Sequence, residues 1–287
     1  MISQLLCFFV VQLLAIAAAQ PYDEKMARFI LPLASAAYSQ RPEICVRKLY
    51  LDAKLIKRFD VLCDESADDT CSGYLALLNG DKAIVVAFRG TTTDMQLKLE
   101  GDDTLLIDDF YGMGKVHRYF YRAFITLWND GGMKNEFESL TKQYPDYSII
   151  VTGHSLGAAI SSLASAAILK ERKFTNPKVY HYNYGQPRVG DADFAVAHTQ
   201  LIPDFYRVTH GRDGVTVVPD TSLGFVHHAG EVWYNNTMEP GAPYVYCLTD
   251  NQAECSGVKR DQWGDHRYYF GIKVPVYGRH GCSSRIF

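Results

Sequence analysis

The stretch "IIVTGHSLGAA", Ile149 to Ala159, consists of an apolar run, a Gly-x-Ser-x-Gly turn and a series of small residues. The apolar run predicts a buried strand, and the small residues predict the start of a helix that packs closely on it. A turn of this kind presents its serine on a strained backbone, and Gly153 and Gly157 leave room for the helix to pass the strand. Serine between glycines also occurs in ordinary turns, so a role for Ser155 as nucleophile depends on other segments.

The remainder of the chain alternates between strand and helix patterns. A hairpin is expected around Asn79-Gly80-Asp81, leading into a buried strand at 83–88, and "KVYHYNYG" and "FYRVTHG" predict two further strands. Helical patterns cover 26–38, 116–128, 133–144, 156–170 and about 191–198. This alternation predicts an α/β fold with a mainly parallel central sheet flanked by helices, formed by a single domain over 20–287. The Gly-x-Ser-x-Gly turn, "FRGTT" and "THGRD" all follow strand ends, so they are expected to meet at one edge of the sheet.

The first segment, 1–19, has an uncharged apolar centre and ends in Ala-x-Ala, which is typical of a secretory signal peptide cleaved before Gln20. Gln12 interrupts the apolar run, which is short for a membrane span of roughly 20 residues. We therefore expect a secreted, extracellular protein without a transmembrane anchor after cleavage. The formal net charge of −3 and the lack of a basic block argue against nucleic acid as a partner.

Removal of the signal peptide leaves six cysteines, an even number that predicts a disulfide framework in an exported protein. Their spacing does not choose among the possible pairings. A zinc site is disfavoured because the sequence has no C-x-x-C pair, and no metal is expected. Asn235 begins an Asn-Asn-Thr sequon and is a candidate for glycosylation.

If Ser155 is a nucleophile, an acid and a base should follow it in that order along the chain. Asp213 directly follows a predicted strand and is the preferred acid, with Asp204 and Asp220 as competitors. The candidates for the base are the later histidines, His227, His228, His266 and His280. His154 is expected to pack or hydrogen-bond, because a neighbour of the serine on such a turn points away from it.

Four motifs, "VVAFRGTT", "VTGHSLGAA", "YGQPRVGD" and "DHRYYFGI", occur in this order and together resemble the fungal-type (class 3) triacylglycerol lipase family. The resemblance extends from about residue 74 to residue 282. It implies an α/β-hydrolase fold and cleavage of carboxylic esters of lipids without a cofactor.

The resemblance also implies roles for individual residues. Ser155 would be the nucleophile, Asp213 the acid and His266 the base. The backbone N–H groups of Thr91 and Leu156 would form the oxyanion hole. The family's disulfide pattern implies the pairs Cys45–Cys282, Cys63–Cys71 and Cys247–Cys255.

Family lipases cover the site with a short helical lid, and the corresponding stretch here is 93–103. It has no tryptophan, and Met95, Leu97 and Leu99 recur at a spacing of two, which fits a helical apolar face poorly. Whether the acyl-ester lipid substrate is met at a lipid–water interface therefore stays open, and a smaller, more soluble ester is an alternative.

The sequence thus favours a secreted serine ester hydrolase that acts on acyl lipids. One alternative is an esterase or phospholipase of the same family that acts on other esters. Another is a non-catalytic lipid- or glycan-binding protein with a lipase fold. A serine protease is disfavoured, because the motif order and the "GQPRVG" segment resemble lipases.

Overall fold

The structure is a computed structural model, and it describes residues 22–63, 70–91, 106–107, 109–202, 204–248, 255 and 259–283. The expected signal peptide, 1–19, and the expected lid, 93–103, lie outside the described residues. The part of the chain that is described contains no helix both long and apolar enough to cross a bilayer.

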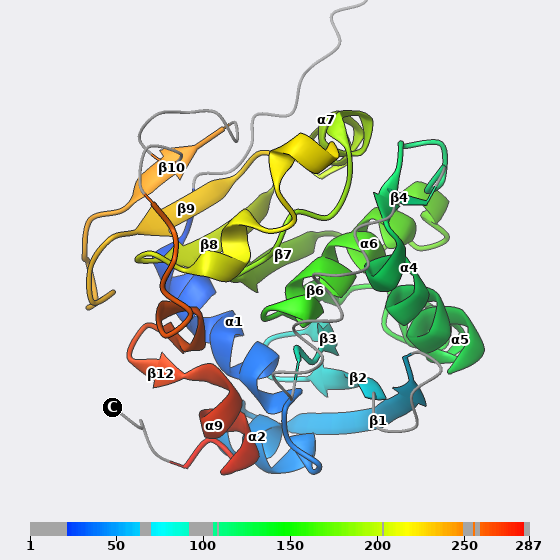
Figure 1. The fold of residues 1–287 in the computed structure, drawn as a ribbon. Helices are drawn as coiled ribbons and strands as arrows, with labels where there is room; N and C mark the ends of the chain where they lie inside the picture. Colours follow the sequence, from blue (N-terminus) through cyan, green and yellow to red (C-terminus); the bar gives the residue numbers. More distant parts are fainter. Residues whose placement is uncertain are drawn as a thin grey trace, which may run out of the picture.

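An eight-stranded sheet forms the centre of the described structure, with strand order β1-β2-β3-β6-β7-β8-β9-β10 (Figure 1). The neighbours from β3 to β9 pair in parallel, and β1-β2, β2-β3 and β9-β10 pair antiparallel. The strands are β1 (Ala53–Leu62), β2 (Thr70–Leu78), β3 (Ala83–Phe88), β6 (Ser148–Gly153), β7 (Val179–Tyr184), β8 (Phe205–His210), β9 (Glu231–Tyr234) and β10 (Val245–Cys247). Two short pairs lie outside this sheet, β4 (Leu106–Ile107) with β5 (Val116–His117) and β11 (Tyr268–Tyr269) with β12 (Ile272–Lys273).

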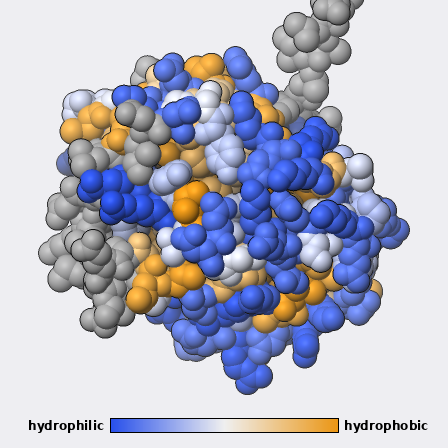
Figure 2. All heavy atoms as spheres, turned by 90° about the vertical axis from the view of Figure 1, so that its right-hand side faces the viewer, coloured by the Kyte–Doolittle hydropathy of each residue, from blue (hydrophilic) through white to orange (hydrophobic). Residues whose placement is uncertain are grey.

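Helices cover both faces of the sheet. One face carries α1 (Glu24–Ala36), α2 (Pro42–Leu49) and α9 (Val274–Arg279). The other carries α4 (Arg118–Ile125), the π-turn η1 (Thr126–Asp130), α5 (Met133–Gln143), α6 (Leu156–Glu171) and α7 (Ala192–Leu201). Two apolar cores result, one between the sheet and each helical layer. The outer side formed by α4 and α5 is largely hydrophilic, with separate apolar groups (Figure 2). The mainly parallel α/β sheet expected from the sequence is confirmed.

The segment 116–128 differs from the single helix predicted for it. Val116 and His117 form the short strand β5, and the helix begins only at Arg118. The backbone N–H of His117 donates to the carbonyl of Val189 at 2.8 Å, and β5 pairs with β4. Tertiary pairing therefore takes the first two residues from the helix that their spacing favours.

Pro32 lies inside α1 and does not end it. Proline removes one helical hydrogen bond and costs about 3 kcal/mol in a helix interior. Asp23 caps the first turn, because its side chain accepts hydrogen bonds from the N–H groups of Lys25 and Met26. Burial of one side of α1 against the sheet stabilises the helix further.

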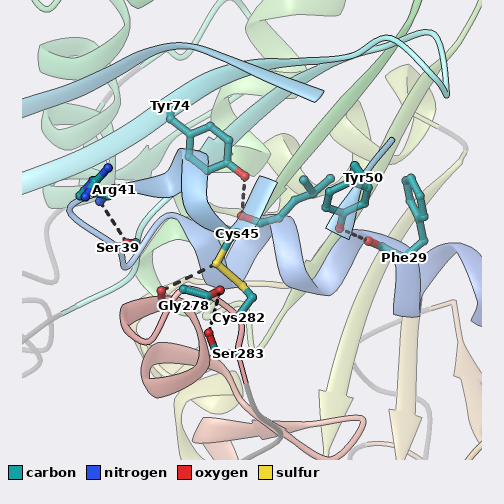
Figure 3. The surroundings of a disulfide bond; sticks show 11 residues. Phe29, Ser39, Arg41, Cys45, Tyr50, Tyr74, Gly278, Cys282 and Ser283 are labelled. Atoms are coloured by element: carbon teal, nitrogen blue, oxygen red, sulfur yellow. Dashed lines mark hydrogen bonds between the residues drawn. A yellow bond between two sulfur atoms is a disulfide. The ribbon is translucent and has the colours of Figure 1, made fainter. Parts of the chain in front are cut away.

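The described residues form three disulfides, Cys45–Cys282, Cys63–Cys71 and Cys247–Cys255, the pairs implied by the family resemblance. Cys45 lies on α2 and Cys282 just after α9, so their bond joins the two ends of the fold beside α1 (Figure 3). Helix α9 is pressed against α1: a Cβ on Gly278 would lie 1.7 Å from the carbonyl oxygen of Ser35. The disulfide therefore lies next to the tightly packed contact between α9 and α1.

Removing the Cys45–Cys282 bond should destabilise the protein more than removing Cys63–Cys71. The first closes a sequence separation of 237 residues and the second a separation of 8. In the chain-entropy model, the losses are about 5 and about 2–3 kcal/mol. Urea unfolding of the paired Cys→Ser variants measures both values, and equal losses would contradict the loop-length argument.

A buried polar cluster lies between α6, α7 and the sheet. The rings of His198 and His228 stack with centroids 4.0 Å apart, and the hydroxyl of Ser162 contacts Nε2 of both. The side-chain amide of Gln186 lies 2.8 Å from Nε2 of His228. Burial lowers the pKa of His198 to about 3, and the pKa of His228 is lowered well below its ordinary value. Both rings are therefore held neutral.

The free energy of unfolding should decrease as the pH is lowered below about 6.5, the pKa of histidine in an unfolded chain. Between that value and the folded pKa of about 3 for His198, the unfolded chain binds more protons than the folded one. The free energy of unfolding then decreases by up to about 1.4 kcal/mol per pH unit for each such histidine. Denaturant unfolding at pH 7, 6 and 5 measures this slope. His198→Gln should make it shallower, and the same change at the exposed His280 should leave it unaltered.

Candidate active site

Ser155 lies at the turn between β6 and α6 with φ 62° and ψ −130°, a backbone conformation that non-glycine residues seldom adopt. The turn is possible because the helix passes very close to the strands. A Cβ on Gly153 would lie 2.1 Å from the carbonyl oxygen of Gly157, and one on Gly157 would lie 2.3 Å from that of Phe88. The Ser155 N–H donates to the carbonyl of Tyr184 at 2.9 Å. Ser155 thus stands at the N-terminus of α6, just beyond the end of β6.

The loop after β3 lies against the serine. A Cβ on Gly90 would be 2.9 Å from the Cβ of Ser155, so Thr91, the next residue, is close to the same point. Leu156 begins α6, where backbone N–H groups have no partner within the helix. Both predicted oxyanion residues therefore flank the serine, and the helix dipole favours negative charge there. Their function as the oxyanion hole stays a prediction.

Asp213 and His266 meet beyond the end of β8. Nδ1 of His266 donates to Oδ2 of Asp213 at 2.8 Å, which leaves Nε2 as the proton acceptor of the ring. Nε2 is buried and has no hydrogen-bond partner among the described residues. The ring also packs against Gly185, where a Cβ would approach Nδ1 to 2.9 Å. The histidine is therefore oriented, in the tautomer required to take a proton.

The environment of Asp213 keeps it ionised. Burial by itself would raise the pKa of this carboxyl, but the charge and hydrogen bond of His266 lower it below its ordinary value. Tyr269 also donates its hydroxyl to Oδ2 at 2.8 Å, and the N–H of Val215 donates to Oδ1 at 2.9 Å. A carboxylate bonded in this way can stabilise a positive charge on the His266 ring.

His154, the neighbour of the serine, makes hydrogen bonds, as the sequence suggested. Its Nε2 donates to the backbone carbonyl of His266 at 2.7 Å, and its Nδ1 accepts from the hydroxyl of Tyr38 at 2.7 Å. Burial and the nearby His266 lower the pKa of His154 to about 3, so it stays neutral. Its hydrogen bond to the carbonyl fixes the backbone of His266 beside the Ser155 turn.

The competing candidates lie elsewhere. Asp220 is exposed and caps the 3₁₀ turn η3 (Thr221–Leu223), whereas Asp204 precedes β8 with Oδ2 3.9 Å from Nζ of Lys178. His280 is exposed. His227 donates from Nε2 to the carbonyl of Thr216, and His228 belongs to the buried cluster under α6. The structure brings Asp213 and His266, rather than these residues, together at the edge that carries Ser155.

A set of contacts that sequence reasoning missed holds the Asp213 and His266 segments together. Arg260 and Glu231 form a buried ion pair at 2.7 Å, and Arg260 also donates to the hydroxyl of Thr216 at 2.9 Å. The N–H of Gln262 donates to the carbonyl of Arg212 at 2.8 Å. Each of these pairs joins segments that are distant in sequence, so no local sequence pattern predicts it.

Within the described ranges, no group of three or more His, Cys, Asp or Glu side chains is placed to hold a metal ion.

The model of the family described as Lipase (class 3) matches residues 85–223. A lipase of Caenorhabditis elegans is 35% identical over 298 aligned residues, which cover 91% of this chain and 83% of that protein. The chain belongs to the class 3 lipase family. As a member of it, the protein is a lipase-like ester hydrolase with a serine nucleophile.

Two further relatives are informative. The structure of Rhizomucor miehei triacylglyceride lipase is similar with a TM-score of 0.74 at 26% identity, covering 90% of this chain and 98% of that one. The secreted mono- and diacylglycerol lipase A of Penicillium cyclopium is 33% identical over 172 residues, which span 59% of this chain and about half (53%) of that protein. The likeness to the Rhizomucor structure therefore extends over nearly the whole fold.

Asp213→Asn should lower kcat by about 10⁴, as loss of the acid does in serine triads, because the amide no longer fixes the His266 tautomer. Asp220→Asn is the matched control, since Asp220 is exposed and caps a turn. Ester hydrolysis by the two folded variants measures the difference. A large loss in Asp220→Asn, with activity retained in Asp213→Asn, would reverse the assignment of the acid.

Proposed function

We propose that Ser155, His266 and Asp213 form the catalytic triad of a lipase that hydrolyses acyl-ester lipids. The observation that carries the proposal is the oriented Asp213–His266 pair at the sheet edge that carries Ser155. Its Nε2 is buried and has no hydrogen-bond partner in the part of the chain that is described. Neither residue neighbours the serine in sequence, and their meeting at the strained turn is what general-base activation of a serine requires.

In the proposed reaction, Ser155 attacks the ester carbonyl as Nε2 of His266 takes its proton. Asp213 stabilises the imidazolium, and the N–H groups of Thr91 and Leu156 hold the oxyanion of the tetrahedral intermediate. His266 then protonates the leaving alcohol, which leaves an acyl-enzyme on Ser155. Water, deprotonated by His266, releases the fatty acid and restores the serine. Asp213 stays ionised throughout.

The proposed substrates are glycerides. The names of the Rhizomucor and Penicillium relatives, a triacylglyceride lipase and a mono- and diacylglycerol lipase, support an acyl glycerol as the class. Interfacial activation is part of the proposal because a similar fungal lipase, solved with an inhibitor (TM-score 0.72, 25% identity), is the basis of a model for it.

We also propose that the protein is secreted, that residues 1–19 are its signal peptide and that Asn235 carries a glycan. The Penicillium relative is named as secreted, and Asn235 is exposed just after β9. The three disulfides fit an oxidising compartment. The N-terminal sequence of the exported protein should then begin at Gln20, and Asn235→Gln should lower its mass by one glycan.

Ser155→Ala should lower kcat on glycerol esters by roughly 10⁶, as loss of the nucleophile does in other triads. Ser222→Ala, a change at an exposed serine, is the control and should retain full activity. A fluorophosphonate probe should label the wild-type and Ser222→Ala proteins and fail to label Ser155→Ala. Hydrolysis of esters from tributyrin to triolein, below and above their solubility limits, measures chain length and interfacial activation together. Undiminished hydrolysis by a folded Ser155→Ala protein would reject the triad.

A further inference from the structure

A cavity of about 850 Å³ lies on the face of the sheet that carries α1. It is formed by the start of α1, the first residues of β7 and β8 and the loop that leads into β10. Its residues Lys178 and Asp204 precede β7 and β8, whereas Ser155 and Asp213 follow the ends of β6 and β8. None of the proposed catalytic residues lines it, and we call it the tyrosine groove.

Five tyrosines line the groove: Tyr22, Tyr180, Tyr182, Tyr206 and Tyr244. The Tyr22 ring lies 4.9 Å from that of Tyr244 and 5.5 Å from that of Tyr206, and Tyr182 lies 4.9 Å from Tyr206. Tyr182 and Tyr206 are buried, and Tyr244 is 41% exposed. Tyr22, Tyr182, Tyr206 and Tyr244 are therefore joined by ring contacts into an aromatic wall. Tyr180 also lines the groove and is, like Tyr22, partly exposed.

Groups that can hydrogen-bond stand beside the rings. Nζ of Lys178 lies 4.6 Å from the centre of the Tyr180 ring and 3.9 Å from Oδ2 of Asp204. The hydroxyls of Tyr180 and Tyr244 have no hydrogen-bond partner within the described part of the chain. Donors and acceptors thus border the aromatic wall.

The charges of the lining balance. The lining contains three acidic side chains and three basic ones. The acidic ones are Asp23, Glu24 and Asp204, and the basic ones are Lys25, Arg28 and Lys178. This balance favours a neutral ligand over a polyanion. Among the described lining residues, Met26 and Pro240 are the only aliphatic ones, so the groove offers little surface for an acyl chain.

We propose that the tyrosine groove binds a neutral oligosaccharide. A pyranose ring has C–H faces that pack on tyrosine rings and an edge of hydroxyls that exchange hydrogen bonds with tyrosines, carboxylates and ammonium groups. Tyrosine suits this task because it combines a flat apolar surface with a polar tip, and few bonds need to be fixed on binding. The cavity volume lies in the range of small-molecule sites.

Sugar binding in the groove does not depend on the proposed esterase activity. The groove uses none of the residues assigned to the triad or the oxyanion hole, so sugar bound there would leave hydrolysis of a soluble ester unchanged. Its role would be to hold the enzyme on a glycan-bearing surface while the serine edge meets its ester.

Calorimetric titration of the disulfide-intact protein tests the proposal, with cellopentaose, chitopentaose and maltopentaose as probes. We expect at least one of them to bind. The double variant Tyr180→Ala/Tyr244→Ala should weaken that binding by about 5- to 150-fold, since aromatic contacts contribute about 0.5–1.5 kcal/mol each. Tyr144→Ala is the matched control, because Tyr144 is a partly exposed tyrosine outside the groove.

Hydrolysis of p-nitrophenyl butyrate by all these variants reports separately on the active site and should not change. The proposal would be overturned if none of the three sugars bound at millimolar concentration. Equal weakening in Tyr144→Ala, tighter binding of a sulfated heparin oligosaccharide, or displacement of the sugar by a fluorophosphonate on the serine would also overturn it. Loss of esterase activity in Ser155→Ala with sugar binding retained would support both proposals independently.

Discussion

The close approach of α6 to β6 and β3 is the constraint on which the rest of the site depends. At Gly157, a side chain of even one carbon would collide with the carbonyl of Phe88, and at Gly153 with that of Gly157. Because both positions are glycine, the helix can approach the strands this closely. The chain can then turn sharply from strand to helix and hold Ser155 at a positive φ. Strain of this kind persists only where the surroundings over-determine it. Here the parallel pairing of β3, β6 and β7 supplies that support.

The acid and the base are held by a different kind of interaction. Asp213, Arg260 and Glu231 are buried, and a buried charge is tolerated only when it is paired and hydrogen-bonded. His266 and Tyr269 bond Asp213, whereas Thr209 and Arg260 bond Glu231. The same polar contacts that satisfy these charges therefore fix the two loops relative to each other. Removing one partner would leave the other charge buried without compensation.

Much of the fold follows from local pattern. The turn at Asn79-Gly80 joins β2 to β3 as a hairpin, and α5, α6 and α7 match the helical patterns to within a few residues. The departure at β5 arises because distant contacts outweigh local preference, whereas α1 forms as predicted with Pro32 inside it. The ten-residue strand β1 was not predicted, because its half-exposed edge position carries two lysines and an arginine in place of an apolar run. Edge strands give weak signals for this reason.

The sequence by itself determined the class of the protein and its candidate triad, because the strand–turn–helix around Ser155 and the order of the motifs are local features. Only the tertiary structure decided which carboxylate meets which histidine, since Asp213 and His266 lie 53 positions apart and meet where the segment after β8 pairs with the segment around Gln262. The sequence likewise did not predict three further features: the Arg260–Glu231 pair, the neutral histidines under α6 and the tyrosine groove. Each depends on side chains from separate elements, whose proximity is set by packing and not by spacing along the chain.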